Sequence, residues 1–140
     1  MKPTLLIADS DAELCDLFKR FLIKRGYDVE TASDGLDCLA KLRRATPAAV
    51  VLDLELRWGG GDGVLAWLRE ERPGAAVILT ATAGRGLEAS DILEPPVLGL
   101  LPKPFTLSAL LEKVRSAVAR GQELVRKEGC LDALPELFLG

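Results

Sequence analysis

The sequence predicts a doubly wound α/β domain, in which helices cover both faces of a five-stranded parallel sheet. Short apolar segments alternate along the chain with segments whose apolar residues recur every three or four positions, which is the pattern of βαβ units. The segment AAVVLD (48–53) is apolar up to its final carboxylate, as is typical of a strand buried on both faces. Right-handed crossovers between such strands place the helices on both sides of the sheet.

Composition limits the functions that the chain can have. Its 140 residues suffice for one domain with a real core. The net charge of -3 argues against a nucleic-acid-binding surface, and no apolar run approaches the roughly 20 residues of a membrane span. The sequence has no histidine and three widely spaced cysteines, which excludes Ser-His or Cys-His catalysis and indicates reduced, mostly buried thiols. We therefore expect a cytoplasmic protein without a signal peptide.

The first half of the chain contains three expected strands and two expected helices. The strands cover 4–8, 27–31 and 48–53, and the second is half-exposed at a sheet edge because it alternates apolar and polar residues. A helix from Glu13, capped by Ser10 or Asp11, ends at Gly26 and turns inward Leu14, Leu17, Phe18, Phe21 and Leu22. A second helix, capped by Ser33 or Asp34 and closed by Pro47, turns inward Leu36, Leu39 and Leu42.

The second half repeats this order. A flexible loop over 57–63 leads to a short helix over 64–71 with Leu65 and Leu68 inward, a strand over 75–80, a weak helix over 87–93 and a strand over 97–101. A long helix follows from a Thr106 or Ser108 cap, with Gly129 as its stop and with Leu107, Leu110, Leu111, Val114 and Val118 inward. Residues 121–140 form a helical extension or tail that packs on the domain, binds a partner or second copy, or begins a linker.

Polar side chains follow four of the predicted strands. They are Asp9, Ser10 and Asp11 after the first, Asp53, Thr80, and Lys103, and the carboxyl ends of parallel strands share one edge of a sheet. Carboxylates that close together repel one another and need a cation. Mg²⁺ prefers such oxygen ligands and a phosphate partner, while a lysine and a hydroxyl suit phosphate oxygens. The set predicts metal-assisted phosphoryl transfer to Asp53 as a carboxylate nucleophile.

At this point the chain resembles the receiver domains of two-component response regulators. The resemblance covers about residues 4–120 and is carried by LLIADSD, VVLDLEL, VILTA and the KPF that begins at Lys103. It implies a flavodoxin-like fold with strand order 2-1-3-4-5, a receiver domain over 1–120, and a signalling switch rather than an enzyme. It also implies a histidine kinase or phosphotransfer protein as partner, and homodimers that pair through the fourth helix, fifth strand and fifth helix.

The resemblance also implies a role for each site residue. Asp53 would accept the phosphoryl group, Thr80 and the Ala81 amide would contact it, and Lys103, followed by a cis bond to Pro104, would pair with it. Asp9, Asp53 and the main-chain carbonyl of Glu55 would hold Mg²⁺.

Three departures from the family pattern bear on this expectation. Ser10 stands where a second metal-binding acid is usual, which weakens the metal site unless Ser10 itself or Asp11 reaches the ion; the other role for Asp11 is a helix cap. Arg57 stands at a usual proline, and Asp62-Gly63 comes two residues late, so the next helix is short and Trp58 is either exposed or a lid. Leu100 replaces the usual switch aromatic.

Two other functions compete with a working switch. The departures favour a pseudo-receiver, which keeps the fold as a protein-interaction module without phosphorylation. A small flavodoxin-like cofactor binder or hydrolase shares the architecture, but it needs a phosphate-cradling loop after the first strand, where Asp9-Ser10-Asp11 has the wrong charge.

Overall fold

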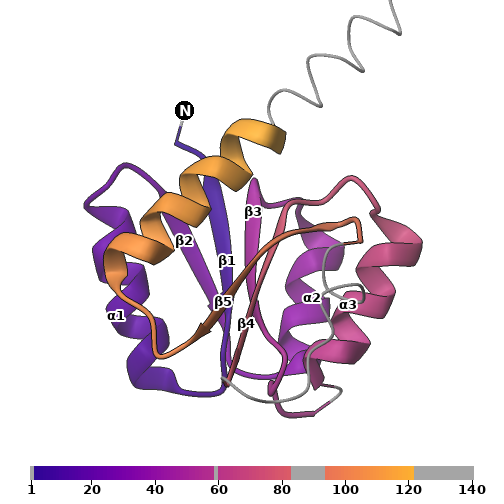
Figure 1. Ribbon diagram of the computed structural model, residues 1–140. Coiled ribbons are helices and arrows are strands. Elements are labelled where there is room, and N and C mark those ends of the chain that lie inside the picture. The colour runs from indigo at the N-terminus through magenta and orange to yellow at the C-terminus, as the bar shows by residue number, and fades with distance from the viewer. Residues whose placement is uncertain (1, 59, 83–93, 122–140) are drawn as a thin grey trace, which may run out of the picture.

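A parallel sheet forms the centre of the molecule, as expected. A computed structural model of the chain describes residues 2–58, 60–82 and 94–121. In these ranges the sheet has five strands in the order β2-β1-β3-β4-β5, which confirms the predicted order (Figure 1). The strands are β1 (Thr4–Ala8), β2 (Asp28–Ala32), β3 (Ala49–Asp53), β4 (Val77–Thr82) and β5 (Val97–Lys103). The helices are α1 (Ala12–Ile23), α2 (Gly35–Arg44), α3 (Gly60–Glu71) and a C-terminal helix described over residues 107–121.

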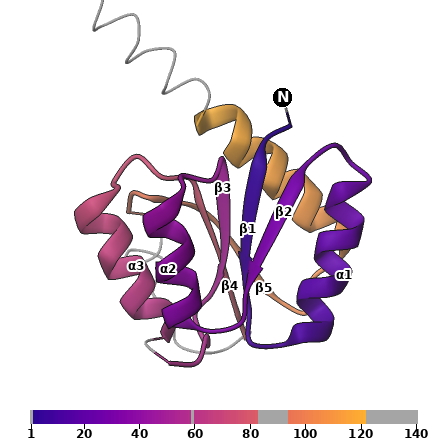
Figure 2. The same cartoon turned by 180° about the vertical axis from the view of Figure 1, so that it is seen from behind.

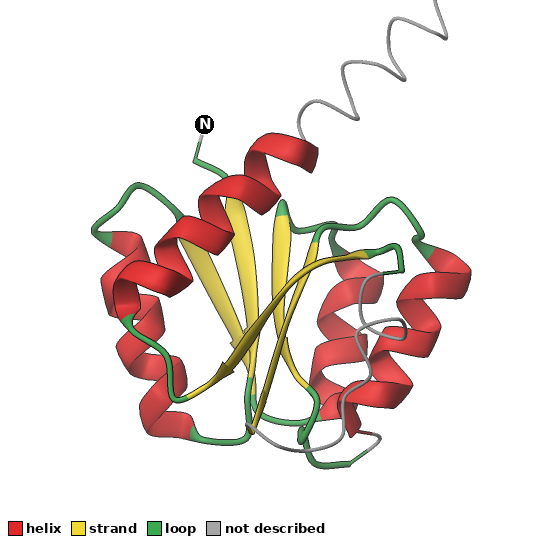
Figure 3. Cartoon of the chain, viewed as in Figure 1, coloured by secondary structure: helices red, strands yellow, loops and turns green. Residues whose placement is uncertain are grey.

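Helices cover both faces of the sheet, which confirms the doubly wound architecture. In Figures 1 and 2, α1 and the C-terminal helix lie on one side of the sheet and α2 and α3 on the other, and Figure 3 shows the same two helical layers by type. Alternate residues of each strand divide between two cores. Leu5, Ile7 and Val51 pack with α1 and the C-terminal helix. Leu6 and Leu52 pack with α2 and α3.

Side-chain caps fix where three helices begin. The Asp11 carboxylate accepts hydrogen bonds from the backbone N–H groups of Glu13 and Leu14, so Asp11 rather than Ser10 caps α1. Asp34 caps α2 in the same way. The Thr106 hydroxyl accepts from the backbone N–H of Ala109 and caps the C-terminal helix.

Two leucines that we predicted to face inward are on the surface. Leu17 of α1 is 47% exposed and Leu36 of α2 is 66% exposed. Cys15 and Cys38 are buried instead. Each cysteine lies two residues from the leucine, and residues two apart on a helix point in different directions. The inward positions of Phe18, Leu42 and several others are confirmed.

The helix after β3 begins earlier than predicted. It starts at Gly60 rather than at residue 64, so α3 has 12 residues and is not short. Residues 60–63, which we expected in a flexible loop, form its first turn. Two properties of glycine permit this start: Gly60 has a φ of +64°, which other residues rarely adopt, and Gly61 lies directly against the backbone of β3.

Strand β5 continues two residues past its predicted end, to Lys103. It runs through Pro102, which lacks a backbone N–H. An edge strand tolerates proline because only one of its sides is paired, and β5 is at the edge next to β4. The edge position of β2 is confirmed, and β2 and β4 are shifted by one or two residues from prediction.

Several expectations lie outside the described residues. These are the weak helix over 87–93, the tail after residue 121 and Cys130. Among the helices that the structure describes, none is long and apolar enough to cross a membrane.

Candidate functional site

The strand register brings the predicted site residues to one edge of the sheet. Asp53 of β3 pairs with Thr80 of β4, and Thr82, two residues on, pairs with Lys103 of β5. On the other side of β3, Leu52 pairs with Ala8 of β1, so Asp9 follows next to Asp53. The carboxyl ends of β1, β3, β4 and β5 therefore bring two acids, a threonine and a lysine to the same edge of the sheet.

The two carboxylates are held in the same way. In each, Oδ1 accepts a hydrogen bond from the backbone N–H two residues on: Asp11 for Asp9, at 2.8 Å, and Glu55 for Asp53, at 3.0 Å. Aspartate commonly forms this turn. In each, Oδ2 faces Lys103, whose Nζ lies 2.9 Å from Asp9 and 3.1 Å from Asp53. One ammonium group thus joins the two acids through their second oxygens.

Burial makes these charges interact strongly. Asp9 and Asp53 are each 4% exposed and Thr80 is 2% exposed, so little water screens them. Burial of the Lys103 ammonium alone would lower its pKa, but its hydrogen bonds to Asp9 and Asp53 outweigh this and raise the pKa above the ordinary lysine value. Lys103 is therefore held in its charged form. With two carboxylates and one lysine, the site attracts a further cation.

The acids at this edge could hold a magnesium ion. Among the described residues no group of three or more histidine, cysteine, aspartate or glutamate side chains is placed to hold a metal. The site does contain a pair of carboxylates, Asp9 and Asp53, and each directs one oxygen at the same cation, the Lys103 ammonium. Mg²⁺ is commonly bound by one or two carboxylates, with waters and phosphate completing its shell, so the donor set fits this ion.

Ser10 and Asp11, in the loop between β1 and α1 (the acid loop), were our other two candidate metal ligands. Both have hydrogen-bond partners outside the Asp9, Asp53 and Lys103 cluster. The Ser10 hydroxyl accepts a hydrogen bond from the backbone N–H of Arg57 at 3.0 Å. The Asp11 carboxylate caps α1.

The residues expected to contact a phosphoryl group lie beside Asp53. The Thr80 carbonyl accepts a hydrogen bond from the backbone N–H of Leu54, which ties β4 to the turn after Asp53. Ala81 follows on β4 and is 1% exposed. The Lys103–Pro104 peptide is cis, as the resemblance implied.

Leu100, which stands at the position of the usual switch aromatic, is partly buried against the α2 and α3 core.

Sequence reasoning missed two residues that shape the site. A Cβ at Gly61 would lie 2.3 Å from the Asp53 carbonyl oxygen, so Gly61, and not Gly63, is the glycine that packs on the acceptor strand. The Cys15 thiol donates a hydrogen bond to the Asp9 carbonyl at 3.3 Å. The spacing of Cys15 from Leu22 on α1 could have indicated its inward position, whereas nothing in the glycine run distinguished Gly61.

Trp58 lies on the surface, in the loop that follows β3. Its side chain is 72% exposed, so of our two alternatives, an exposed residue and a lid, the structure shows the exposed one. Its φ is +53°, which is uncommon for a residue other than glycine.

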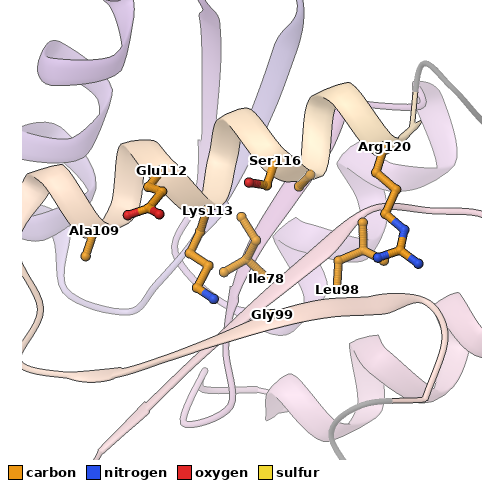
Figure 4. A pocket seen from close by; sticks show the side chains of 9 residues that line it. Ile78, Leu98, Gly99, Ala109, Glu112, Lys113, Ser116 and Arg120 are labelled. Carbon is orange, nitrogen blue, oxygen red and sulfur yellow. The ribbon is translucent and has the colours of Figure 1, made fainter.

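A pocket away from this edge lies between β5 and the C-terminal helix. In Figure 4 Lys113 reaches from the helix toward Gly99 of β5, Glu112 lies beside it, and Arg120 lies farther along the helix near Leu98. A Cβ at Gly99 would lie 3.2 Å from Lys113 Cδ. The pocket contains none of the predicted site residues.

The fold and the site define a flavodoxin-like α/β domain with an acidic carboxyl edge and a lysine. The sequence profile of the response regulator receiver domain matches residues 5–115. The chain belongs to the response regulator receiver domain family of two-component systems, as its motifs indicated.

Curated relatives share this domain within longer proteins. Response regulator MprA of Mycobacterium leprae is 32% identical over 123 residues, covering 83% of this chain and 51% of that protein. A protein-glutamate methylesterase/protein-glutamine glutaminase of Anaeromyxobacter dehalogenans is 34% identical over 129 residues, covering 84% of this chain and 36% of that protein. The chain thus spans about half or less of these two relatives.

Solved structures confirm the fold. A CheY-like response regulator receiver domain protein of Methanospirillum hungatei matches with a TM-score of 0.81 and 24% identity, over 88% of this chain and 98% of that one. The chemotaxis response regulator CheY4 of Vibrio cholerae matches with a TM-score of 0.76 and 22% identity, over 84% of this chain and 99% of that one.

Proposed function

We propose that this receiver domain accepts a phosphoryl group on Asp53 from a histidine kinase or phosphotransfer protein, and acts in the cytoplasm as a signalling switch rather than as an enzyme. One observation carries the proposal: Lys103 Nζ lies within hydrogen-bond distance of both Asp9 and Asp53. This contact gathers a nucleophile, a second acid and a phosphate-binding cation at one point.

The chain's own residues have distinct parts in the transfer. A carboxylate oxygen of Asp53 forms the new O–P bond as the P–N bond to the donor histidine breaks, and the leaving imidazole nitrogen keeps the electron pair. Lys103 offers a positive charge to the phosphoryl oxygens, and Thr80 and the Ala81 amide are the expected hydrogen-bond donors to them. The backbone contact from Thr80 to Leu54 keeps β4 next to the acceptor turn.

Magnesium is the expected cofactor. Asp9, Asp53 and the main-chain carbonyl of Glu55 are the proposed ligands. When bound, the ion neutralises charge on the carboxylates and the phosphoryl oxygens. Ser10 supplies no ionic charge, so we expect weaker binding of the ion than at a site with a further acid.

Intact mass after exposure to a small phosphodonor tests the proposal. The protein is incubated with and without Mg²⁺, beside Asp53→Ala and a control, Asp62→Ala, whose carboxylate lies on α3. A phosphoryl adduct that requires Mg²⁺ and Asp53, and that Asp62→Ala retains, is the expected result. No adduct at saturating Mg²⁺ and donor would contradict it.

A second function is favoured by the engagement of Ser10. Residue 10 is a serine and not an acid, and its hydroxyl already accepts a hydrogen bond from the Arg57 N–H. Both facts favour a pseudo-receiver that acts only as an interaction module. The mass experiment separates the two functions. If wild type gives no adduct and Ser10→Asp does, the defect lies at the metal site and the pseudo-receiver is supported.

A further inference from the structure

The backbone of Arg57 joins two loops and the start of a helix beside Asp53. Its N–H donates to the Ser10 hydroxyl in the loop between β1 and α1, at 3.0 Å. Its carbonyl accepts from the N–H of Gly35 at the start of α2, at 2.7 Å. Arg57 itself lies in the loop after β3, four residues from Asp53. These two bonds therefore connect the acid loop, the acceptor loop and the first turn of α2.

Two departures in the sequence meet in this contact. A proline at position 57 would have no N–H to donate, and a second acid at position 10 would bring a further negative charge next to Asp9 and Asp53. Ser10 accepts the hydrogen bond without adding charge. The serine and the arginine N–H therefore complement each other across 47 residues of chain.

We infer that Ser10 and Arg57 form a clip that assembles the acceptor edge without a metal ion. In the metal site that the resemblance implies, Mg²⁺ would join Asp9 to Asp53 and the Glu55 carbonyl. Here a neutral hydrogen bond joins the loop after β1 directly to the loop after β3. Ser10 is thus a positioning residue and not a metal ligand. The part of this inference that concerns Mg²⁺ rests on the proposed function, whereas the clip itself does not.

The turn after Asp53 makes the clip effective. The Leu56 N–H bonds to the Asp53 carbonyl at 3.2 Å, and the Leu56 side chain is 3% exposed, so the turn is closed and anchored in the core. Arg57 follows at once. Holding its N–H therefore fixes the position of residues 53–56, which include the Glu55 carbonyl.

Amide hydrogen exchange in EDTA tests the clip in the whole chain. Wild type is compared with Ser10→Ala, which removes the acceptor, with Arg57→Pro, which removes the donor, and with Arg57→Ala, which keeps the N–H as a matched control. The Gly35 amide reports on the clip because it donates to the Arg57 carbonyl. We expect Ser10→Ala and Arg57→Pro each to loosen Arg57 and to speed exchange of the Gly35 amide by about fivefold, the effect of losing roughly one hydrogen bond. Arg57→Ala should match wild type, and the double variant Ser10→Ala/Arg57→Pro should exchange no faster than either single variant.

Magnesium titration by calorimetry separates a positioning residue from a ligand. If Ser10 positions the loops, Ser10→Ala and Arg57→Pro weaken Mg²⁺ binding by similar factors. Weaker binding in Ser10→Ala alone would make Ser10 a ligand and overturn the inference. Unchanged Gly35 exchange in Ser10→Ala, or wild-type protection that appears only when Mg²⁺ is added, would also overturn it. The exchange measurement uses neither metal nor phosphodonor, so its result stands apart from failure of the phosphorylation test.

Discussion

The Cα of Gly61 in the first turn of α3 lies so close to Asp53 that a Cβ built on it would approach the Asp53 carbonyl oxygen to 2.3 Å and the Leu54 Cα to 2.5 Å. Real Cβ atoms do not approach other atoms so closely, and the atoms in the way are backbone. The helix after β3 can therefore lie against the acceptor residue only if position 61 is glycine.

Substitution of Gly61 is expected to disturb the acceptor turn. Gly61→Ala should lower the free energy of unfolding by about 1–3 kcal/mol, because the backbone of β3 must shift, and should reduce phosphoryl acceptance by Asp53. Gly63→Ala is the matched control: its Cβ would meet nothing within 4 Å, and alanine in a helix is preferred to glycine by roughly 0.5–1 kcal/mol. Urea denaturation measures both. Equal stability of the two variants would contradict the packing argument.

Lys103 is expected to make stability depend on alkaline pH. Its pKa is higher in the folded protein than the ordinary 10.5 of the unfolded chain, so the folded state holds the proton more tightly. The contribution of the Lys103 proton to the free energy of unfolding is fully present below pH 10.5 and is lost as the pH rises through the folded pKa.

Comparison of wild type with Lys103→Met isolates this contribution. At pH 8 the variant should be less stable by about 1–3 kcal/mol, because buried acceptors lose a charged donor. The difference should begin to shrink above pH 10.5 and should be lost as the pH rises through the folded pKa, where the Lys103 of wild type also loses its charge. Urea unfolding at several pH values measures the difference, and a difference that stays constant through this range would contradict the role of the lysine proton.

The two buried cysteines should be inert toward alkylation in the native protein. Burial raises the pKa of the Cys15 thiol to about 11 and that of Cys38 to about 12, with nearby Asp9 and Asp37 adding to the effect. The thiolate is the reactive form, and it is scarce at pH 8. Iodoacetamide labelling followed by peptide mass analysis should modify both residues far more slowly in buffer than in urea. Rapid native labelling of Cys38 would show that α2 opens readily.

Trp58 should account for most of the quenching of tryptophan fluorescence by acrylamide. It is 72% exposed, whereas Trp67 is partly buried and has the Arg72 guanidinium 5.4 Å from its ring centre. Trp58→Phe should therefore remove most of the quenching, and Trp67→Phe should retain it. The opposite result would mean that Trp58 covers the site in solution as a lid.

The sequence alone determined the architecture and placed the candidate site residues at one edge of the sheet. The strands around Leu6, Val51 and Ile78 are continuous apolar runs, and a run buried on both faces is a local property of the chain. Each run ends in a polar residue, and parallel strands place their carboxyl ends on one edge. Asp9, Asp53, Thr80 and Lys103 could therefore be brought together before any coordinates were known.

Only the tertiary structure decided how that edge is held together. Leu17 and Leu36 belong to apolar patterns that fit more than one helix face, and packing selected the faces with Cys15 and Cys38. Gly61 of α3 packs on Asp53 of β3, and the Arg57 N–H contacts Ser10 across 47 residues of chain, so neither contact lies within one helix or strand. The Arg57 N–H and the Asp53 carbonyl in these contacts are backbone groups, which almost every residue type carries. The serine at position 10 and the glycine at position 61 permit the contacts, but only the fold decides which backbone group each of them meets.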